Sequence, residues 1–135
     1  MRSNLFTKFL IIVSVFIIIF RSSSAINTKD TRLMHQPALS SNQIIFIYAN
    51  DLWTANIDGT NARRLTADEG VESNPCFSPD GNFIAFSAEY DGNTDVFLIP
   101  SQGGIPERLT WHPSADLVRG FTPDGKAVLF ASARE

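Results

Sequence analysis

Three residues near position 114 carry the side chains of a catalytic triad. His112, Ser114 and Asp116 place an imidazole, a hydroxyl and a carboxylate at alternate positions. A triad needs the base within about 3 Å of the nucleophile and an acid that orients the base. In an extended segment, side chains two residues apart are separated by roughly 6–7 Å, because each residue adds about 3.3 Å. We therefore expect a loop here and predict no catalytic residue in this chain; His35, which has no partner pattern, is interpreted in the same way.

An acidic string from Asp91 to Asp95 has the spacing that opens an EF-hand calcium loop. Such a loop needs glycine at its sixth position and a bidentate glutamate at its twelfth. Here those positions hold Val96 and Gln102, so the pattern fails. We expect a hairpin tip whose Asp and Asn side chains bind their own backbone, with a weaker calcium site at this tip as the alternative. No metal-ligating residue is predicted.

No cofactor motif is present. Gly103-Gly104 lacks the following Gly-Lys pattern of a phosphate-binding loop and precedes Pro106. Cys76 is the one cysteine, which excludes an intrachain disulfide and any multi-cysteine metal site. Because it has no basic neighbours in the sequence, we predict a buried, inert thiol.

Charge divides the chain into two parts. The 135 residues have a net charge of −3, yet the first 25 contain three basic residues and no acidic ones. The remaining 110 have eight basic and fourteen acidic side chains, a net charge of −6. Because nucleic-acid binding needs clustered Lys and Arg to neutralise phosphates, no nucleic-acid partner is expected.

Residues 1–25 have the three-part pattern of a secretory signal peptide. Arg2 and Lys8 precede an uncharged run of 12 residues, 9–20, and Ser23 and Ala25 supply the small residues that precede a cleavage site. The alternative is a membrane anchor, but 12 residues of helix span only about 18 Å, and a spanning helix needs about 20 residues. We expect cleavage near Ala25, a periplasmic or secreted mature chain, and no membrane attachment afterwards.

A 44-residue repeat organises the rest of the chain. Arg64-Leu65-Thr66 recurs as Arg108-Leu109-Thr110, and Phe77-Ser78-Pro79-Asp80-Gly81 recurs as Phe121-Thr122-Pro123-Asp124-Gly125. The offset falls to 40 between Phe46 and Phe86, so four extra residues are assigned to a hairpin tip at 89–94. Aromatic residues at the same spacing are interpreted as packing residues rather than as a carbohydrate-binding platform: Trp53, Phe77, Phe97 and Phe121.

The repeat predicts an all-β chain. Short runs rich in β-branched and aromatic residues are bounded by Gly, Pro, Asn or Asp, and no helical period extends over ten residues after residue 26. The runs expected as strands are 44–48, 52–57, 63–66, 75–77, 83–88, 96–100 and 127–131. Repeats of about 40–45 residues with about four strands each are typical of β-propeller blades.

The domain organisation follows from this period. A lead-in at 26–40 is followed by partial propeller units at about 41–81, 82–125 and 126–135, the last one truncated. This amounts to about 2.5 four-stranded blades, whereas closed rings have about 4–8. We therefore expect an incomplete β-propeller that cannot close by itself and that needs further blades or self-association into a homo-oligomer.

Two strings carry a resemblance to a known family. Tyr90-Asp91-Gly92-Asn93-Thr94-Asp95-Val96 is followed by Arg108-Leu109-Thr110-Trp111-His112-Pro113, and 50–53, 63–66 and 72–75 add to the match. From Leu33 to Glu135 the chain resembles the amino-terminal propeller of exported bacterial tricorn-type proteases. The Pro-Asp-Gly repeat alone is shared with TolB-like periplasmic propellers and with the propellers of prolyl-oligopeptidase-type peptidases.

The resemblance implies a piece of a large serine peptidase. In that family two propellers channel and filter peptides, a PDZ-like module follows, and carboxy-terminal domains carry the catalytic set. No position of this sequence matches that catalytic region, so we expect a scaffolding and substrate-guiding role without activity of its own. Expected partners are the rest of the propeller, the peptidase domains, and peptides or proteins. The alternative is a non-enzymatic TolB-like propeller that binds protein partners.

The signal-peptide prediction has a direct test. Expressed in a Gram-negative host, the chain should be cut after Ala25 and appear in the periplasm, because the small residues at Ser23 and Ala25 fit a cleavage site. Amino-terminal sequencing of the product should read Ile26 first. A membrane-bound product that still begins at Met1 would favour the anchor instead.

Overall fold

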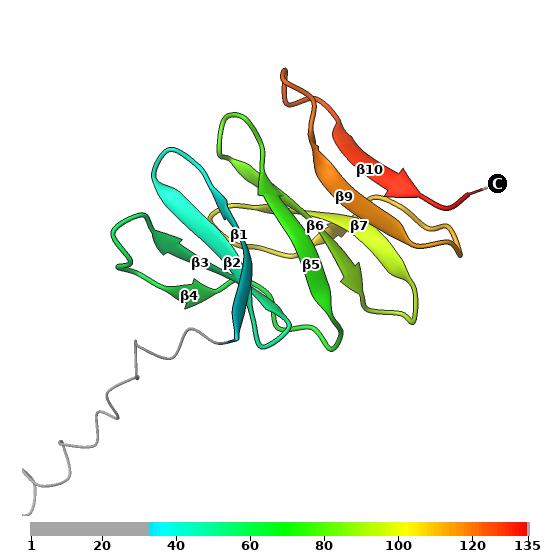
Figure 1. The fold of residues 1–135 in the computed structure, drawn as a ribbon, viewed down its shortest axis with the longest axis horizontal. Helices are drawn as coiled ribbons and strands as arrows, with labels where there is room; N and C mark the ends of the chain where they lie inside the picture. The colour runs from blue at the N-terminus through cyan, green and yellow to red at the C-terminus, as the bar shows by residue number, and fades with distance from the viewer. Residues whose placement is uncertain (1–32, 135) are drawn as a thin grey trace, which may run out of the picture. The chain divides into compact units, whose positions relative to one another are not determined.

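The computed structural model describes residues 33–134 (Figure 1). The predicted signal peptide at 1–25 and residues 26–32 of the lead-in lie outside the described residues. Residues 33–134 form three antiparallel β-sheets and contain no helix, which confirms the all-β prediction. Accordingly, this part of the chain has no helix that could cross a membrane.

The first two sheets have four strands each, and each strand pairs with the next one in the sequence. The first sheet consists of β1 (Met34–Leu39), β2 (Gln43–Tyr48), β3 (Asp51–Asn56) and β4 (Arg63–Arg64). The second consists of β5 (Glu72–Phe77), β6 (Phe83–Glu89), β7 (Thr94–Pro100) and β8 (Glu107–Arg108). The third sheet pairs β9 (Asp116–Phe121) with β10 (Val128–Ser132). Two four-stranded sheets and one two-stranded sheet match the expected 2.5 blades.

The sheets begin earlier in the repeat than the expected units at 41–81, 82–125 and 126–135. The first sheet contains β1, which falls within the expected lead-in at 26–40, and a boundary at residue 81 would divide the hairpin between β5 and β6. A repeat shows its period but not its starting point, so the units were offset by about one strand. Three strands are absent from the expected runs: β1, the two-residue β8, and β9. Of these, β1 is bulged between His35 and Ala38, and the pairing of β9 shifts near Gly120.

The register confirms the position of the four-residue insertion. Phe46 pairs with Trp53 in the first sheet, and Phe86 pairs with Phe97 in the second. The segment between the paired aromatics is therefore four residues longer in the second sheet. The extra residues lengthen β6 and β7 and enlarge the tip between Glu89 and Thr94, as the change in repeat offset predicted.

The Pro-Asp-Gly turns close hairpins by a shared set of hydrogen bonds. The amide of Gly81 donates to the Ser78 carbonyl at 2.9 Å, and Gly81 has φ +74°, a left-handed conformation that glycine adopts without strain. The amide of Phe83 donates to the Ser78 hydroxyl oxygen at 2.9 Å, so this hydroxyl accepts from a following amide as expected. Thr122 and Gly125 make the equivalent contacts 44 residues later.

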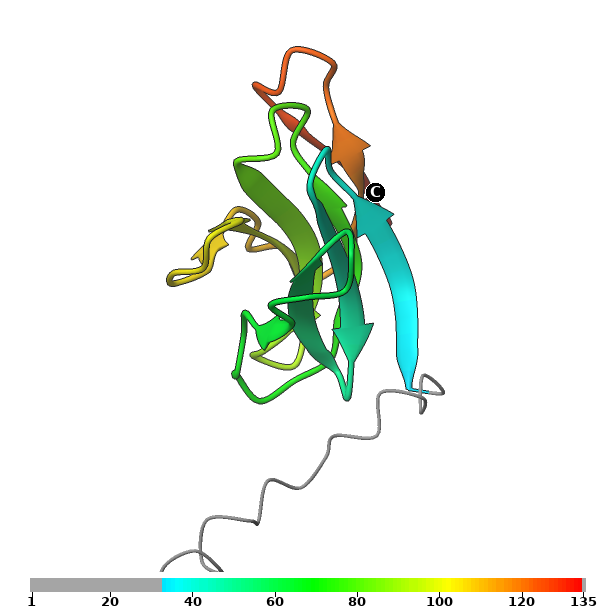
Figure 2. The ribbon, with the colours of Figure 1, turned by 90° about the vertical axis from the view of Figure 1, so that its left-hand side faces the viewer.

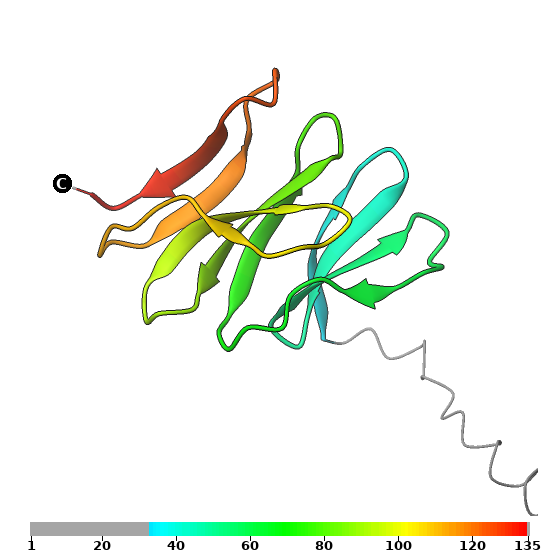
Figure 3. The ribbon, with the colours of Figure 1, turned by 180° about the vertical axis from the view of Figure 1, so that it is seen from behind.

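Neighbouring sheets pack face to face through two apolar layers. The inner strand of each sheet packs against the preceding sheet: β5 contacts β1, β2 and β3, and β9 contacts β5, β6 and β7. Figure 2 shows β1 (cyan) and β8 (yellow) on opposite sides of residues 33–134. In Figure 3, which is turned by 180° from Figure 1, the segment that carries β8 lies in front of the second sheet. The sheets therefore lie beside one another like blades, with β1, β5 and β9 as their inner strands.

The first layer joins the first and second sheets. Its centre is fully buried and consists of alternate residues of β2, β3, β6 and β7, in which Phe86 stacks on Phe97 at 5.7 Å between ring centroids. The buried members are Ile45, Ile47, Leu52, Ile84, Phe86, Ala88, Phe97 and Ile99. The second layer uses the opposite face of β6 and β7, where Ala85 and Val96 meet Val118 of β9. The second sheet is thus covered on both faces, which explains its largely continuous apolar strands.

Gly70, in the segment before β5, lies very close to the backbone of Glu89 at the end of β6. It has φ +153°, and a Cβ atom there would lie 2.2 Å from the carbonyl oxygen of Glu89. Gly120 has the same φ and nothing within 4 Å of such an atom. Both Gly→Ala changes should incur backbone strain of about 1–3 kcal/mol. Gly70→Ala should cost more, above about 4 kcal/mol in total, because the backbone of Glu89 must also move.

The measurement is the free energy of unfolding of both variants by chemical denaturation. Gly120→Ala is the matched control, since it differs only in lacking the clash. Equal losses in the two variants would contradict the close approach of Gly70 to Glu89.

Candidate functional site at the blade junctions

The structure does not bring His112, Ser114 and Asp116 together as a triad. The Nδ1 atom of His112 accepts a hydrogen bond from the backbone amide of Ser114 at 3.1 Å. The carboxylate of Asp116 is fully buried and forms an ion pair with Arg134. Nδ1 of His112 and the carboxylate of Asp116 therefore bind a backbone amide and an arginine, not each other.

The acidic string at 91–95 forms the tip between β6 and β7, where its side chains bind protein groups. Asp91 and Asp95 both contact the guanidinium of Arg108, at 3.1 and 2.5 Å. The side-chain amide of Asn93 donates to the carbonyl oxygen of His112 at 2.5 Å and to Asp95 at 3.2 Å. Among residues 33–134, no group of three or more His, Cys, Asp or Glu side chains is placed to hold a metal ion.

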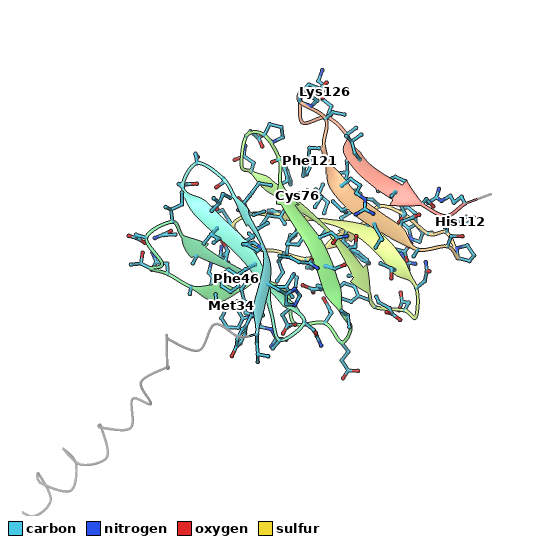
Figure 4. The ribbon with its side chains drawn as sticks, in the orientation of Figure 1. Met34, Phe46, Cys76, His112, Phe121 and Lys126 are labelled. Carbon is cyan, nitrogen blue, oxygen red and sulfur yellow. The ribbon has the colours of Figure 1, made fainter. Side chains whose placement is uncertain are left out.

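Cys76 lies half-buried on β5, beside Phe121, in the layer between the second and third sheets (Figure 4). Burial raises the pKa of its thiol to about 11, although a hydrogen bond with the backbone of Ala85 opposes the shift. The thiol therefore stays protonated, and so weakly nucleophilic, near neutral pH. His35 lies on the exposed inner strand β1.

The aromatic residues of the repeat lie in or against the packing layers. Phe97 is buried, and Phe77 and Phe121 pack at the edges of the first and second layer. Trp53 is half-buried and contacts Tyr48 edge to face at 5.7 Å between ring centroids.

The most developed polar arrangement lies where the chain passes from one sheet to the next. β4 and β8 contain only two residues each, so the amides of Leu52 on β3 and Val96 on β7 have no strand partner there. Both donate instead to a threonine hydroxyl: Leu52 to Thr66 at 2.9 Å and Val96 to Thr110 at 3.0 Å. The Arg-Leu-Thr motif thus satisfies a buried amide where the strand pairing ends.

The arginine of the same motif forms an ion pair with an aspartate of the third strand of its sheet, β3 or β7. Arg64 binds Asp51 at 2.7 Å, and 44 residues later Arg108 binds Asp95. The second pair is more buried, because the side chain of Asp95 is 2% exposed and that of Asp51 is 14% exposed. Arg108 also donates through Nε to the carbonyl oxygen of Thr110 at 2.9 Å.

A buried carboxylate opens the inner strand of each following sheet. Glu72 is the first residue of β5 and Asp116 the first residue of β9, again 44 residues apart, and both are at most 1% exposed. We call Thr66, Glu72 and Tyr90 the first junction cluster and Thr110, Asp116 and Arg134 the second. The third members, Tyr90 and Arg134, are also 44 residues apart, so the two clusters are equivalent in position.

The two clusters neutralise their carboxylates differently. In the first, the hydroxyl of Thr66 donates to Glu72 at 2.7 Å, and the phenol of Tyr90 donates to its other oxygen. In the second, Arg134 pairs with Asp116, and the hydroxyl of Thr110 donates to Asp95 at 3.1 Å. A pair of hydroxyl donors thus holds one carboxylate, and a guanidinium holds the other.

The pKa values of the two carboxyl groups move in opposite directions. Burial raises the pKa of Glu72, and the hydrogen bonds from Tyr90 and Thr66 only partly offset it. Burial acts on Asp116 in the same sense, but its hydroxyl neighbours and Arg134 outweigh it, so the pKa of Asp116 is lowered. Its Oδ1 atom forms no well-shaped hydrogen bond among the described residues, so we ascribe the lowering mainly to Arg134 at Oδ2.

An open pocket of ≈ 420 Å³ lies beside β10. Arg134 lies over the ring of Phe130, 5.4 Å from its centroid. The equivalent residue in the second sheet, Phe86, is covered there by Phe97 of the third strand. The lining of the pocket consists of Leu109, Thr110, Trp111, His112, Phe130 and Arg134.

The model of the tricorn protease N-terminal β-propeller domain matches residues 31–135. The chain belongs to this family. Tricorn protease homolog 1 of Streptomyces coelicolor is 36% identical over 90 residues, which cover 66% of this chain and 8% of that protein. A TolB homolog of Chlorobium chlorochromatii is 29% identical over 148 aligned residues, which cover 76% of this chain and 34% of that protein.

A solved structure agrees with the assignment. The superposition with the crystal structure of the tricorn protease covers 69% of this chain and 10% of the tricorn chain, with a TM-score of 0.62 and 27% sequence identity. The family indicated by the resemblance and the incomplete propeller predicted from the repeat are thus confirmed. The propeller domain described here spans less than a tenth of the length of the Streptomyces relative.

The junction clusters were missed by sequence reasoning, although a signal was available. Glu72 and Asp116 recur at the same 44-residue spacing as the motifs that were used, and so do Tyr90 and Arg134. Their side-chain types differ between the copies, so a search for identical strings passed over them.

The buried ion pair can be tested against its equivalent. Arg108→Gln would leave the nearly buried Asp95 without its cation and should lower the free energy of unfolding of the propeller domain by about 3 kcal/mol. Arg64→Gln removes a more exposed pair and should cost about 0–1 kcal/mol. Chemical denaturation of both variants gives the comparison; a larger loss for Arg64→Gln would contradict the described burial.

Proposed function

We propose that this chain forms part of the propeller by which a tricorn-type serine peptidase guides peptides, with catalysis carried out elsewhere in the assembly. Membership of the tricorn N-terminal propeller family is the observation that carries the proposal. The role is that of a scaffold, and the partners are further blades, the peptidase domains and peptide substrates.

The inner strands supply a surface suited to this role. β1 is exposed along most of its length, and it lies next to β5, as β5 does to β9. Gln36 of β1 accepts a hydrogen bond from the amide of Asn74 of β5 at 2.5 Å, which ties two neighbouring inner strands together. Both residues have positive φ, +52° and +53°, and precede a proline. An exposed inner edge whose neighbouring strands are joined by a hydrogen bond suits a wall along which an extended peptide slides.

Export belongs to the same proposal. The pattern at residues 1–25 supports delivery to the periplasm or the medium, where a peptide-guiding domain would meet extracellular peptides.

A second candidate is a TolB-like propeller that binds protein partners without any enzymatic role. The TolB homolog of Chlorobium chlorochromatii favours it, since it covers 76% of this chain. The coding sequence downstream of codon 135 separates the two. A continuing frame with a PDZ-like stretch and a serine-peptidase region supports the peptidase, whereas a frame that ends after five or six blades supports the TolB-like protein.

The scaffold role predicts binding without turnover. The purified 135-residue chain should retain fluorescent oligopeptides weakly and should hydrolyse none of them above background, because Nδ1 of His112 is bound to the backbone amide of Ser114 and Asp116 is paired with Arg134. Fluorescence anisotropy and mass spectrometry of the same samples give both readings. Hydrolysis that persists through purification and disappears in His112→Ala would contradict the proposal, with Arg64→Gln as a control variant that leaves this loop intact.

A further inference from the structure

The two junction clusters are equivalent in position and opposite in charge balance. Glu72 is 1% exposed and is held by two hydroxyl groups, whereas Asp116 is held by a guanidinium. The difference resides in one position of the repeat, which holds Tyr90 in one copy and Arg134 in the next. A neutral donor leaves a buried carboxylate uncompensated, whereas a cation compensates it.

Within residues 33–134, no cation offsets the charge of Glu72. The charged groups that act on the first cluster are Asp51 of β3 and Asp68 of the segment before β5, and both are acidic. The nearby Arg64 is bound to Asp51 at 2.7 Å. The carboxyl of Glu72 also has uncharged neighbours, which are the backbone of Leu52 and the hydroxyl groups of Thr66 and Tyr90. Burial and Glu72 raise the pKa of Tyr90, so its phenol stays neutral.

We propose that the junction between the first and second sheets is a proton-operated latch, in which Glu72 takes up a proton from solvent and the two sheets hold together more tightly as the pH falls. The step forms one O–H bond on a carboxylate oxygen and needs no other reactant. The second junction, with Arg134 on Asp116, does not take part. This inference goes beyond peptide guiding and does not depend on it.

The geometry shows why this cluster would control the packing of the sheets. Glu72 begins β5, and its amide donates to the carbonyl oxygen of Asn50 in the first sheet at 3.2 Å. Thr66 connects the same carboxyl to the amide of Leu52 on β3. Tyr90 reaches it from the tip between β6 and β7 and also contacts Phe97 at 4.8 Å between ring centroids. The carboxyl of Glu72 therefore links β5 to β3 of the first sheet and to the tip between β6 and β7.

The sign of the pH dependence follows from linkage. Burial raises the folded-state pKa of Glu72 above its usual value of 4.5, so the folded chain holds a proton that the unfolded chain has lost. The stabilisation is fully present below pH 4.5 and is lost as the pH rises through the raised folded-state pKa. Within that window the unfolding equilibrium constant should increase by up to about tenfold per pH unit.

The test is chemical denaturation of the 135-residue chain from pH 8 to pH 5, followed by tryptophan fluorescence. The wild-type chain should become more stable as the pH falls. Glu72→Gln, which cannot ionise, should lose this dependence, and Asp116→Asn at the equivalent position should keep it. Tyr90→Arg places a cation where Arg134 stands in the next copy, and it should abolish or reverse the dependence.

A flat wild-type profile, or an unchanged dependence in Glu72→Gln, would overturn the latch. If Glu72→Gln does not fold, the carboxyl carbons of ¹³C-labelled glutamate in the wild-type chain provide the reading by NMR. One resonance should titrate above the usual range and should shift in Tyr90→Phe. Titration of every glutamate at its usual pH would equally overturn the proposal.

Discussion

The contact between the Thr66 hydroxyl and the Glu72 carboxyl is the interaction on which the arrangement of the first two sheets depends. The chain leaves the outer edge of one sheet and begins the inner edge of the next, and it buries polar groups at the crossing. Thr66 accepts from the amide of Leu52 at 2.9 Å and donates to Glu72 at 2.7 Å. One hydroxyl thus satisfies a backbone donor and a buried acid from two sheets. Without it, the amide of Leu52 would be buried without a partner, at a cost of about 1–3 kcal/mol, and Glu72 would keep only the hydrogen bond from Tyr90.

This constraint explains why the Arg-Leu-Thr motif is identical in the two copies of the repeat. The apolar layers need only side chains of suitable volume on the correct face of each strand. The junction needs donors and acceptors in definite positions, because buried polar groups must be paired. Arg64-Leu65-Thr66 and Arg108-Leu109-Thr110 are therefore identical, whereas the residues that face the layers, such as Leu52 and Val96, differ in shape. A scaffold built in this way depends on its polar joints to keep the blades in register.

Much of the fold could be predicted from the sequence because it is encoded locally. The Pro-Asp-Gly turns specify hairpins through proline φ and a glycine at positive φ, and the four-residue insertion was located from a change in offset alone. The strands β1 and β9 could not be found in this way, because bulges near Pro37 and Gly120 interrupt their alternation. The residue at which each blade begins could not be predicted either, since a repeat period does not show which strand is innermost.

The sequence by itself determined the all-β class, the 44-residue blade, the family, and the mismatch of the 91–95 string with a calcium loop. Each of these depends on residue types at fixed spacing along the chain. Only the tertiary structure decided that Glu72 and Asp116 occupy the same buried position and have opposite pKa shifts. The reason is physical: burial raises the pKa of Glu72, and Arg134 helps to lower that of Asp116, from which it lies 18 residues away in the sequence, and both effects arise only when the sheets are packed. A desolvated charge depends on what surrounds it in space, and spacing along the chain does not show that.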